Sequence, residues 1–400
     1  MTICRYLAAV LAFFLTMTSS VSAQEGVAMA AQRANALPLT PFYDVEGADL
    51  SRPGALVRSE AGTGYNLPGG VTATRIAYAS RNVSGEPVLA TGVVLVPPGN
   101  PPAGGWPVIA WAHGTAGVAR VCAPSLMKDL YYGWDGLFIY PLMGYAVVAT
   151  DYAGLGSPGV HQYMWGRAQA NDVAYSVPAA RAAVASLGEK WVAIGHSQGG
   201  YAVLRVQSMD DQAKAGFLGS IPISSGAEIA DVWALSDAHM RPIGSSILMM
   251  ALSIKSVHRD FDLAKMIGPG ALEKLPVIEQ QACLDAADEA LRGVTRERGR
   301  VEGWMEVPEV ADFARENRIF NEPYNYPILL LLSSGDEYIA PALQKQIPRD
   351  LCRVATRASY KFMTGVDHEG TINASLRDQF AWMADRFAGR PVPPGCSAMN

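Results

Sequence analysis

Near the middle of this 400-residue chain lies the segment Gly195-His196-Ser197-Gln198-Gly199-Gly200, which matches the G-x-S-x-G pattern of a nucleophile elbow. Residues 190–194 are typical of a short buried strand, and residues 201–209 are typical of the start of a helix. A sharp turn between a strand and a helix strains the middle residue and leaves no room for side chains at the flanking glycines. The pattern therefore predicts that Ser197 is a nucleophile at a helix N-terminus, where free N–H groups stabilise an oxyanion. The alternative is an ordinary serine at a glycine-rich strand end.

Length and composition indicate one large α/β domain with an inserted subdomain. Half of the residues are hydrophobic, which is enough for a sizeable core. The formal net charge is only −5 and there is no basic run, so nucleic acid is not an expected partner. The spacing of the cysteines and histidines does not fit a metal site, and we expect neither a metal nor an organic cofactor. The oligomeric state is left open.

The first 23 residues have the features of a secretory signal peptide. Arg5 supplies a positive charge, residues 7–17 form an apolar run, and Val21-Ser22-Ala23 fits the small-x-small cleavage rule. We therefore expect cleavage near Ala23 and export to the periplasm or the extracellular space. An uncleaved membrane anchor is the alternative, although the apolar run is short for a membrane-spanning helix.

The cysteines agree with export, because Cys4 leaves with the signal peptide and an even number remains. Four cysteines allow three pairings, and four free thiols are the alternative. We expect a Cys122–Cys283 disulfide that fastens a helical insertion to the core. We also expect a Cys352–Cys396 disulfide that holds the C-terminus after the last helix.

Strand and helix patterns alternate along most of the chain, which predicts a mostly parallel sheet flanked by helices. Strands are expected at residues 71–79, 88–96, 108–111, 145–150, 190–194, 218–224, 328–333 and 355–363. Helices of the core are expected at 171–187, which contains Pro178, and at 376–387. The first two of these are expected to form an antiparallel hairpin at the sheet edge, and residues 24–70 are expected to be irregular.

Between residues 227 and 326 the strand signals vanish and helical ones dominate, for example at 247–257, 282–291 and 310–317. This pattern predicts a helical insertion that caps the site. The expected organisation is a signal peptide at 1–23, a first core part at 24–226, the helical cap at 227–326 and a second core part at 327–400.

A serine hydroxyl needs a base, and the base needs an orienting acid. Where an elbow serine opens the triad, the acid and then the histidine follow it in the chain. His368 lies in a loop between the last strand and the last helix, whereas His239 and His258 lie in the helical insertion. We therefore expect His368 to be the base. The acid is expected to be Asp336, just after the 328–333 strand, with Glu337 as its rival.

The oxyanion hole requires two backbone donors. One is expected to be the N–H group of Gln198, and the second that of Gly114 or Thr115, in the loop after the 108–111 strand. His113 is assigned to this same loop. The other strand-end carboxylate, Asp151, precedes the serine and is expected to brace a loop through backbone N–H groups.

Two further histidines are expected to have structural roles: His161 as a surface or packed loop residue, and His196 as a residue that faces the interior beside the nucleophile.

Several short motifs in the chain are similar to one known family. They are His-Gly-Thr at 113–115, Cys-Ala-Pro at 122–124, Asp-Tyr-x-Gly-Leu-Gly at 151–156 and Gly-His-Ser-Gln-Gly-Gly at 195–200. Together with a helical cap before the acid strand, they resemble the secretory lipase family of α/β-hydrolases, the Candida antarctica lipase A type, over roughly residues 40–390. The resemblance implies an α/β-hydrolase fold and a secreted lipase or carboxylesterase with Ser197, Asp336 and His368 as its triad.

The expected function is hydrolysis of carboxylic esters, with a small-molecule or lipid ester as substrate and an acyl-enzyme intermediate. The cap contains an apolar stripe that either lines the substrate pocket or belongs to ordinary packing, namely Ile247, Leu248, Met249, Met250 and Leu252. A transient contact of the cap with a lipid interface is compatible with this function. One alternative is a peptidase or an aromatic-ester hydrolase with the same triad. A more remote one is a non-catalytic binding protein.

Overall fold

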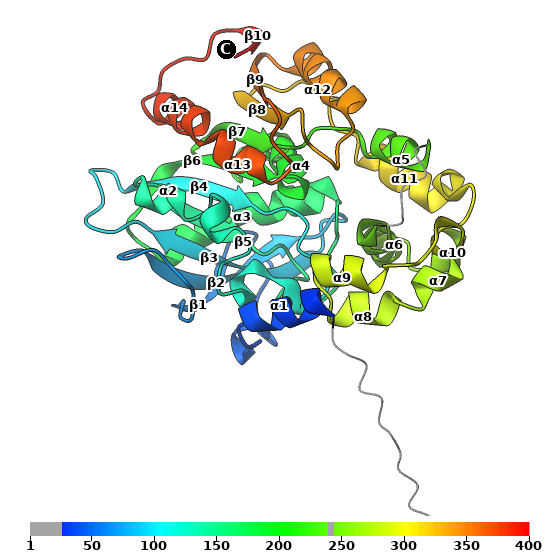
Figure 1. Ribbon diagram of the computed structural model, residues 1–400. Helices are drawn as coiled ribbons and strands as arrows, with labels where there is room; N and C mark the ends of the chain where they lie inside the picture. The colour runs from blue at the N-terminus through cyan, green and yellow to red at the C-terminus, as the bar shows by residue number, and fades with distance from the viewer. Residues whose placement is uncertain (1–25, 239–243, 400) are drawn as a thin grey trace, which may run out of the picture.

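The computed structural model describes residues 26–238 and 244–399 of the chain (Figure 1). The expected signal peptide with its cleavage site near Ala23, as well as Cys4 and His239, lie outside these residues.

The described residues form one sheet of ten strands in the order β1-β2-β3-β5-β4-β6-β7-β8-β9-β10. The strands are β1 (Leu56–Ala61), β2 (Thr72–Arg81), β3 (Pro87–Val96), β4 (Trp106–Ala112), β5 (Ala146–Thr150), β6 (Leu187–His196), β7 (Phe217–Ile223), β8 (Ile328–Ser333), β9 (Arg357–Met363) and β10 (Gly395–Ala398). The pairs from β1 to β3 and the pair of β3 with β5 are antiparallel, and all the others are parallel. The prediction of a mostly parallel sheet is therefore confirmed.

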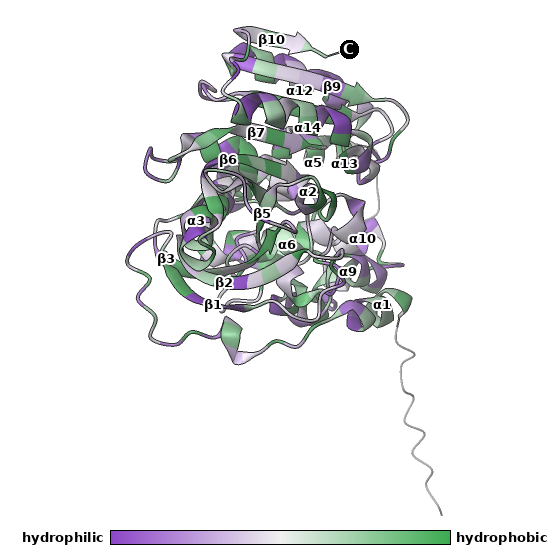
Figure 2. Cartoon of the chain, turned by 90° about the vertical axis from the view of Figure 1, so that its left-hand side faces the viewer, coloured by the Kyte–Doolittle hydropathy of each residue, from purple (hydrophilic) through white to green (hydrophobic). Residues whose placement is uncertain are grey.

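The central strands are almost continuous apolar runs because helices cover both of their faces. All residues of β5 and β8 are buried, and the middle of the sheet is largely hydrophobic in Figure 2. Alternate residues of β4 point to opposite faces: Val108 joins a cluster with residues of α3, whereas Ile109 joins a cluster with residues of α14.

The helices of the core are α2 (Ile139–Leu142), α3 (Gly166–Ala183), α4 (Gln198–Arg205), α12 (Pro341–Val354), α13 (Gly370–Ala374) and α14 (Leu376–Phe387). Helix α3 begins five residues earlier than the sequence predicted and continues through Pro178. Helix α14 has the predicted bounds.

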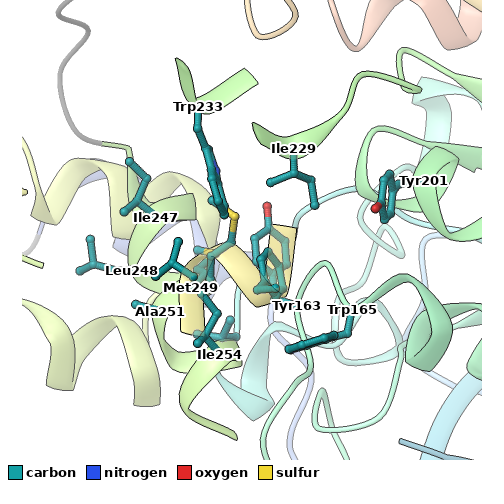
Figure 3. Close-up of a cluster of buried hydrophobic side chains, with 14 of the residues drawn as sticks. Tyr163, Trp165, Tyr201, Ile229, Trp233, Ile247, Leu248, Met249, Ala251 and Ile254 are labelled. Atoms are coloured by element: carbon teal, nitrogen blue, oxygen red, sulfur yellow. The ribbon is translucent and has the colours of Figure 1, made fainter. Parts of the chain in front are cut away.

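The helical insertion between β7 and β8 contains α5 (Ile229–Ala238), α6 (Ser245–Val257), α7 (Pro269–Leu272), α8 (Leu275–Gln280), α9 (Leu284–Ala290), α10 (Arg296–Gly299) and α11 (Pro308–Glu316). It shares one hydrophobic cluster with the core, to which Trp233 and Met249 of the insertion and Trp165 of the core all belong (Figure 3). The indole of Trp165 donates a hydrogen bond to the Ser253 carbonyl oxygen at 3.2 Å. The insertion is thus packed onto the core by apolar contacts and buried hydrogen bonds.

The expectation that residues 24–70 are irregular is wrong. Residues 26–70 contain α1 (Val27–Asn35), a 3-10 turn at Pro41–Tyr43 and the strand β1. Strand β1 pairs antiparallel with β2, so β1 forms the sheet edge in place of the expected hairpin. The far edge also has an unexpected strand, because β10 pairs in parallel with β9.

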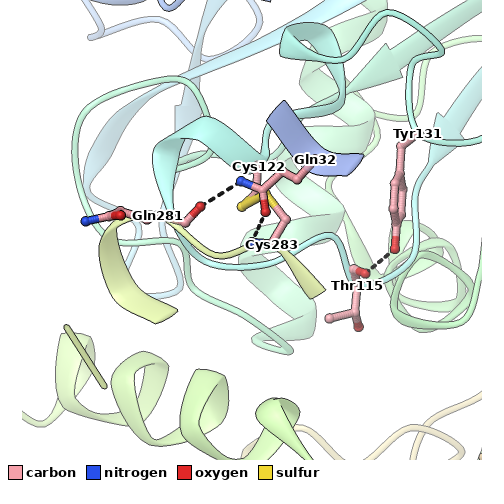
Figure 4. Close-up of a disulfide and its surroundings, with 6 residues drawn as sticks. All are labelled: Gln32, Thr115, Cys122, Tyr131, Gln281 and Cys283. Atoms are coloured by element: carbon pink, nitrogen blue, oxygen red, sulfur yellow. Dashed lines mark hydrogen bonds between the residues drawn. A yellow bond between two sulfur atoms is a disulfide. The ribbon is translucent and has the colours of Figure 1, made fainter. Parts of the chain in front are cut away.

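Tertiary contacts explain why the sequence did not reveal α1. The side-chain oxygen of Gln32 accepts a hydrogen bond from the Cys283 N–H group at 2.8 Å, and its nitrogen donates to the Gln281 carbonyl oxygen at 2.7 Å (Figure 4). None of the helix residues is buried. The helix is held by hydrogen bonds to residues far along the chain, and Ala28 and Met29 pack against the hydrophobic cluster without being fully buried.

Disulfides join Cys122 to Cys283 and Cys352 to Cys396, with Cα–Cα distances of 5.3 and 5.2 Å. The first bridge links the loop after β4 to the start of α9 across 161 residues (Figure 4). In the chain-entropy model, closing a loop of that length stabilises the native state by about 5 kcal/mol. The second bridge ties the strand β10 to α12.

We expect peptide mapping of the purified protein without reduction to show these two cross-linked peptides, because each pair of cysteines is adjacent in the fold. The control is the same digest after reduction and alkylation, in which both cross-linked peptides disappear. A Cys122–Cys352 peptide, or four alkylated thiols in the unreduced sample, would contradict the pairing.

Candidate active site

The backbone of Ser197 has φ 53° and ψ −116° at the junction of β6 and α4. A residue with a side chain adopts such positive φ values only under constraint. The Ser197 N–H group donates to the Ile223 carbonyl oxygen of β7 at 2.9 Å, and the Tyr201 N–H group donates to the Ser197 carbonyl oxygen at 3.1 Å. The strand and the helix therefore hold the serine from both sides.

The glycines of the elbow are required by close contacts of the backbone. A Cβ atom on Gly199 would lie 1.9 Å from the carbonyl oxygen of Ala112, at the end of β4. On Gly195 it would lie 2.2 Å from the Gly199 carbonyl oxygen, and on Gly200 it would lie 2.5 Å from the Ser225 Cβ atom. The steric reason that the sequence suggested for these glycines is the one the structure has.

His368 and Asp336 lie together in loops that follow β9 and β8. The Nδ1 atom of His368 is 2.8 Å from an Asp336 carboxylate oxygen, and both side chains are almost fully buried. The second carboxylate oxygen accepts hydrogen bonds from the N–H groups of Tyr338 and Ile339, at 2.9 and 2.8 Å. The carboxylate is therefore fixed in one orientation toward the imidazole.

The surroundings of Asp336 favour its charged form. Burial alone would raise the pKa of the carboxyl, but the hydrogen bond and charge of His368 and the two backbone N–H groups outweigh it and hold the pKa below its usual value. Its sequence rival Glu337 has a different contact, because its carboxylate accepts the backbone N–H of His368 at 3.1 Å.

The loop after β4 contains the expected oxyanion donors. The Gly114 N–H group already donates to the hydroxyl oxygen of Tyr132 at 3.2 Å. Within the described part of the chain, the Thr115 N–H group has no hydrogen-bond acceptor. The N–H group of Gln198 is likewise unused, as the first amide of α4.

Three other histidines support the site without lying in the position of a base. His196 is buried, with Nδ1 2.8 Å from the Tyr132 hydroxyl and Nε2 3.1 Å from the His368 carbonyl oxygen. The His161 ring nitrogen Nε2 is 3.2 Å from the side-chain nitrogen of Gln198. His113 is buried against the carbonyl oxygens of Gly114 and Asp151.

Desolvation keeps these three rings neutral at pH 7. Burial lowers the pKa of His113 to about 4 and of His161 to about 3. The pKa of His196 falls to about 3, first through burial and then through the charge of His368.

Asp151 has the bracing role that its position suggested. Its carboxylate accepts hydrogen bonds from the Ser125 N–H group at 2.8 Å, the Ser125 hydroxyl at 2.5 Å and the Thr91 hydroxyl at 2.7 Å. Burial raises the pKa of Asp151 to about 6 against these bonds. The residue thus connects β3, the end of β5 and the 122–126 segment.

A cavity of about 450 Å³ contains Ser197, His368, Gln198 and Thr115 in its lining. The helical insertion supplies most of its apolar wall, namely Ile229, Val232, Trp233, Leu235, Ile247, Met250, Leu284 and Trp304. Of the stripe noted in the sequence, Ile247 and Met250 thus line the cavity. All five residues of the stripe belong to one buried cluster, and Leu248, Met249 and Leu252 are not part of the cavity lining.

Sequence reasoning missed Tyr131, Tyr132, Tyr163 and Ser224, which contact the loops of the site. None of them belongs to a recognisable motif, and their roles follow from tertiary position alone. Within the described residues, no helix combines the length and the apolar character needed to cross a membrane.

The elbow geometry generates a test of the fold around the serine. We expect Gly199→Ala to abolish activity and to destabilise the protein, because the new Cβ would overlap the Ala112 carbonyl oxygen. Gly69→Ala is the matched control, since a Cβ there meets nothing within 4 Å. Thermal unfolding and ester hydrolysis measure both effects. A Gly199→Ala variant with wild-type melting temperature and activity would contradict the described turn.

Comparisons with known proteins show the family and the fold of the chain. The model of the "Alpha/beta hydrolase family" matches residues 112–381, which is well over half of the chain. The X-ray structure of Candida antarctica lipase A in its closed state has a TM-score of 0.71 at 13% identity, over 90% of this chain and 88% of that chain. The rice cell wall degrading esterase LipA from Xanthomonas oryzae has a TM-score of 0.67 at 21% identity, over 84% of this chain and 98% of that chain.

No curated protein matches the chain significantly. Because the two solved structures share only 13% and 21% of their residues with this chain, their similarity to it concerns the fold alone. One of them is the lipase type that the sequence motifs resemble. A serine at a strained strand–helix turn, a sheet with this strand order and the match of the family model lead to one conclusion: the chain belongs to the alpha/beta hydrolase family, with a fold similar to those of lipases and esterases.

Proposed function

We propose that this protein hydrolyses carboxylic esters with Ser197, His368 and Asp336 as its catalytic triad. The observation that carries the proposal is the 2.8 Å contact between His368 Nδ1 and the buried Asp336 carboxylate, in the cavity that Ser197 also lines. Since Nδ1 donates to the carboxylate, Nε2 of the neutral imidazole is free to accept the serine proton.

In the first half of the reaction, His368 takes the proton of Ser197 as the hydroxyl oxygen attacks the ester carbonyl carbon. Asp336 holds the imidazole in the correct tautomer and stabilises the imidazolium that forms. The tetrahedral intermediate collapses, His368 returns the proton to the leaving alcohol, and an acyl-serine remains. In the second half, water attacks the acyl-serine while His368 takes its proton, and His368 then gives that proton to the Ser197 oxygen as the acid product leaves.

The oxyanion of each intermediate is proposed to bind the N–H groups of Gln198 and Thr115. Gly114 is the weaker candidate because its N–H group is already bonded to Tyr132. Backbone donors that are fixed before the reaction stabilise developing charge without reorganisation, and the loss of one such donor typically lowers kcat by about 10²–10³-fold.

The substrate is proposed to be an ester with a short or medium apolar chain. The cavity of about 450 Å³ is near the lower end of the roughly 300–1,000 Å³ that is usual for ligand sites. Its wall from α5 and α6 is predominantly apolar, which favours hydrocarbon over charged groups. The solved relatives are named as a lipase and as a cell wall degrading esterase, and both names are compatible with ester substrates.

We further propose that the protein acts after export and that the helical insertion is its cap, including any transient contact with a lipid interface. The two disulfides support an oxidising compartment.

We expect Ser197→Ala and His368→Ala each to lower kcat for p-nitrophenyl butyrate by about 10⁴-fold or more, because the triad acts as a unit. For the same reason, the double variant is expected to be little worse than the worse single variant. Stopped assays on purified protein, with circular dichroism to check folding, measure the effect. Activity within tenfold of wild type in a folded Ser197→Ala variant would refute the proposed nucleophile.

The neighbouring acids Asp336 and Glu337 provide a matched control for the third member. Asp336→Asn is expected to lower kcat by about 10³–10⁴-fold, since an amide does not hold the productive imidazole tautomer. Glu337→Gln keeps an oxygen that accepts the His368 N–H group, and we expect a loss of less than tenfold. The reverse order of the two effects would show that the acid is misassigned.

The cavity wall generates a prediction about chain length. Met250→Trp narrows the cavity, so we expect the ratio of kcat/KM for octanoate over acetate p-nitrophenyl esters to fall at least about tenfold. Met250→Leu, of similar volume, is the control and should change this ratio by less than about threefold. An unchanged ratio in folded Met250→Trp would place the ester chain elsewhere.

A further inference from the structure

Two consecutive residues after the 122–126 segment have strained backbones. Leu130 has φ 56° and Tyr131 has φ 70°, values that residues with side chains rarely adopt and that do not normally occur side by side. Such strain persists only where the surroundings impose it, and it concentrates at functional sites. The turn is held by Asp129, whose carboxylate accepts the Tyr131 N–H group and the Asn35 side-chain N–H group, both at 2.8 Å.

The strained turn delivers two tyrosine hydroxyls to the loop after β4. The Tyr131 hydroxyl donates to the Thr115 carbonyl oxygen at 2.5 Å (Figure 4), and the Tyr132 hydroxyl oxygen accepts the Gly114 N–H group at 3.2 Å. A third hydroxyl, of Tyr163, lies 2.8 Å from the Thr115 side-chain oxygen. The loop is thus held on both sides of the Gly114–Thr115 peptide, whose own N–H group has no acceptor among the described residues.

The direction of the hydrogen bonds at Tyr132 follows from its neighbours. A carbonyl oxygen only accepts, so the Nε2 atom of His196 carries the proton that is donated to the His368 carbonyl oxygen. Since the buried ring is neutral, its Nδ1 atom is an acceptor, and the Tyr132 hydroxyl donates to it at 2.8 Å. The hydroxyl oxygen then accepts from Gly114. One chain of directed bonds therefore joins the loop after β4, the residue beside the nucleophile and the loop of His368.

The position at Gly114 is matched to this arrangement. A Cβ atom there would lie 2.3 Å from the Tyr132 hydroxyl oxygen, so a larger residue would displace the hydroxyl. The Tyr132 ring is buried beside the cavity, with edge contacts to the rings of Trp111 and His196 at centroid distances of 5.4 and 5.5 Å. Neither tyrosine hydroxyl is free to bind substrate, because each is engaged with the protein.

We propose that Tyr131 and Tyr132 are positioning residues that fix the Thr115 N–H group as the second donor of the oxyanion hole, with His196 as the anchor of the Tyr132 hydroxyl. The inference rests on the proposed esterase function and explains how its transition state is stabilised. The two tyrosines act through the backbone of the loop, so their removal affects the oxyanion more than the binding of the uncharged ester.

The test compares Tyr132→Phe with Tyr140→Phe. Both substitutions remove one buried tyrosine hydroxyl that makes a hydrogen bond, but the Tyr140 hydroxyl donates to Gln379 at 2.6 Å, away from the loop after β4. The readouts are kcat and KM for p-nitrophenyl butyrate, the inhibition constant of an alkyl trifluoromethyl ketone that forms an oxyanion with the serine, and thermal unfolding.

For Tyr132→Phe we expect kcat to fall about 10–100-fold with KM changed less than about threefold, and the ketone to bind weaker by a factor similar to that of kcat. Tyr140→Phe should lower the melting temperature comparably while keeping kcat and the inhibition constant within about twofold. Tyr131→Phe removes the hydrogen bond to the Thr115 carbonyl oxygen, and we expect it to change kcat and the inhibition constant as Tyr132→Phe does. If Tyr132→Phe does not fold, Tyr131→Phe alone provides the test.

Folded Tyr131→Phe and Tyr132→Phe variants with kcat and ketone affinity within twofold of wild type would overturn the positioning role while leaving the esterase function intact. Losses of kcat and of ketone affinity in Tyr140→Phe equal to those in Tyr132→Phe would also overturn the positioning role, since they would show that any loss of stability lowers activity. A wild-type protein that neither hydrolyses esters nor binds the ketone would instead contradict the proposed function, and the positioning role with it.

Discussion

The backbone conformation of Ser197 is the constraint on which the rest of the site depends. At φ 53° and ψ −116°, the serine turns the chain from β6 directly into α4. This turn is sterically possible only because residue 199 is a glycine, since a Cβ atom there would lie 1.9 Å from the Ala112 carbonyl oxygen at the end of β4. The close approach places the N-terminus of α4 beside the loop that follows β4. The candidate oxyanion donors on the two elements are therefore neighbours as a consequence of the elbow itself.

The remaining groups are fixed by hydrogen bonds between loops at the carboxyl ends of the parallel strands. The His368 carbonyl oxygen accepts bonds from His196 at 3.1 Å and from the Ser224 hydroxyl at 3.0 Å, so its loop is tied to the ends of β6 and β7. Asp336 is tied to its own loop by backbone N–H groups. A buried network of this kind is rigid because an unpaired member would be costly. Rigidity suits a site that must hold donors in place before charge develops.

The helical insertion adds the shape of the cavity to this rigid base. Its helices share one apolar cluster with Trp165 and other core residues, and the Cys122–Cys283 disulfide joins them to the loop after β4. The same attachment lies next to α1, whose Gln32 bonds the backbone on both sides of Ala282. The insertion that forms the apolar wall with α5 and α6 is thus attached to the core at residues 281–283. This attachment helps to hold the apolar wall next to the polar catalytic groups.

The sequence predicted what depends on local pattern and missed what depends on tertiary contacts. The elbow, the sheet class and the bounds of β8 and α14 follow from glycine spacing and apolar period, and the structure confirms them. Helix α1 and strand β1 were missed because partners far along the chain hold them. The tyrosines at 131 and 132 were missed for a related reason, since the turn before them is held by the bonds of Asp129 to Tyr131 and to Asn35, far along the chain, and has no sequence signature.

The role of Ser197 is tested most directly by the site at which a fluorophosphonate probe modifies the protein, determined by mass spectrometry of the intact and digested protein. We expect one adduct per chain, on the peptide that contains Ser197, and none after heat denaturation, since only the folded site activates that hydroxyl. An adduct on another residue of the folded protein, or equal labelling of the denatured chain, would contradict this role.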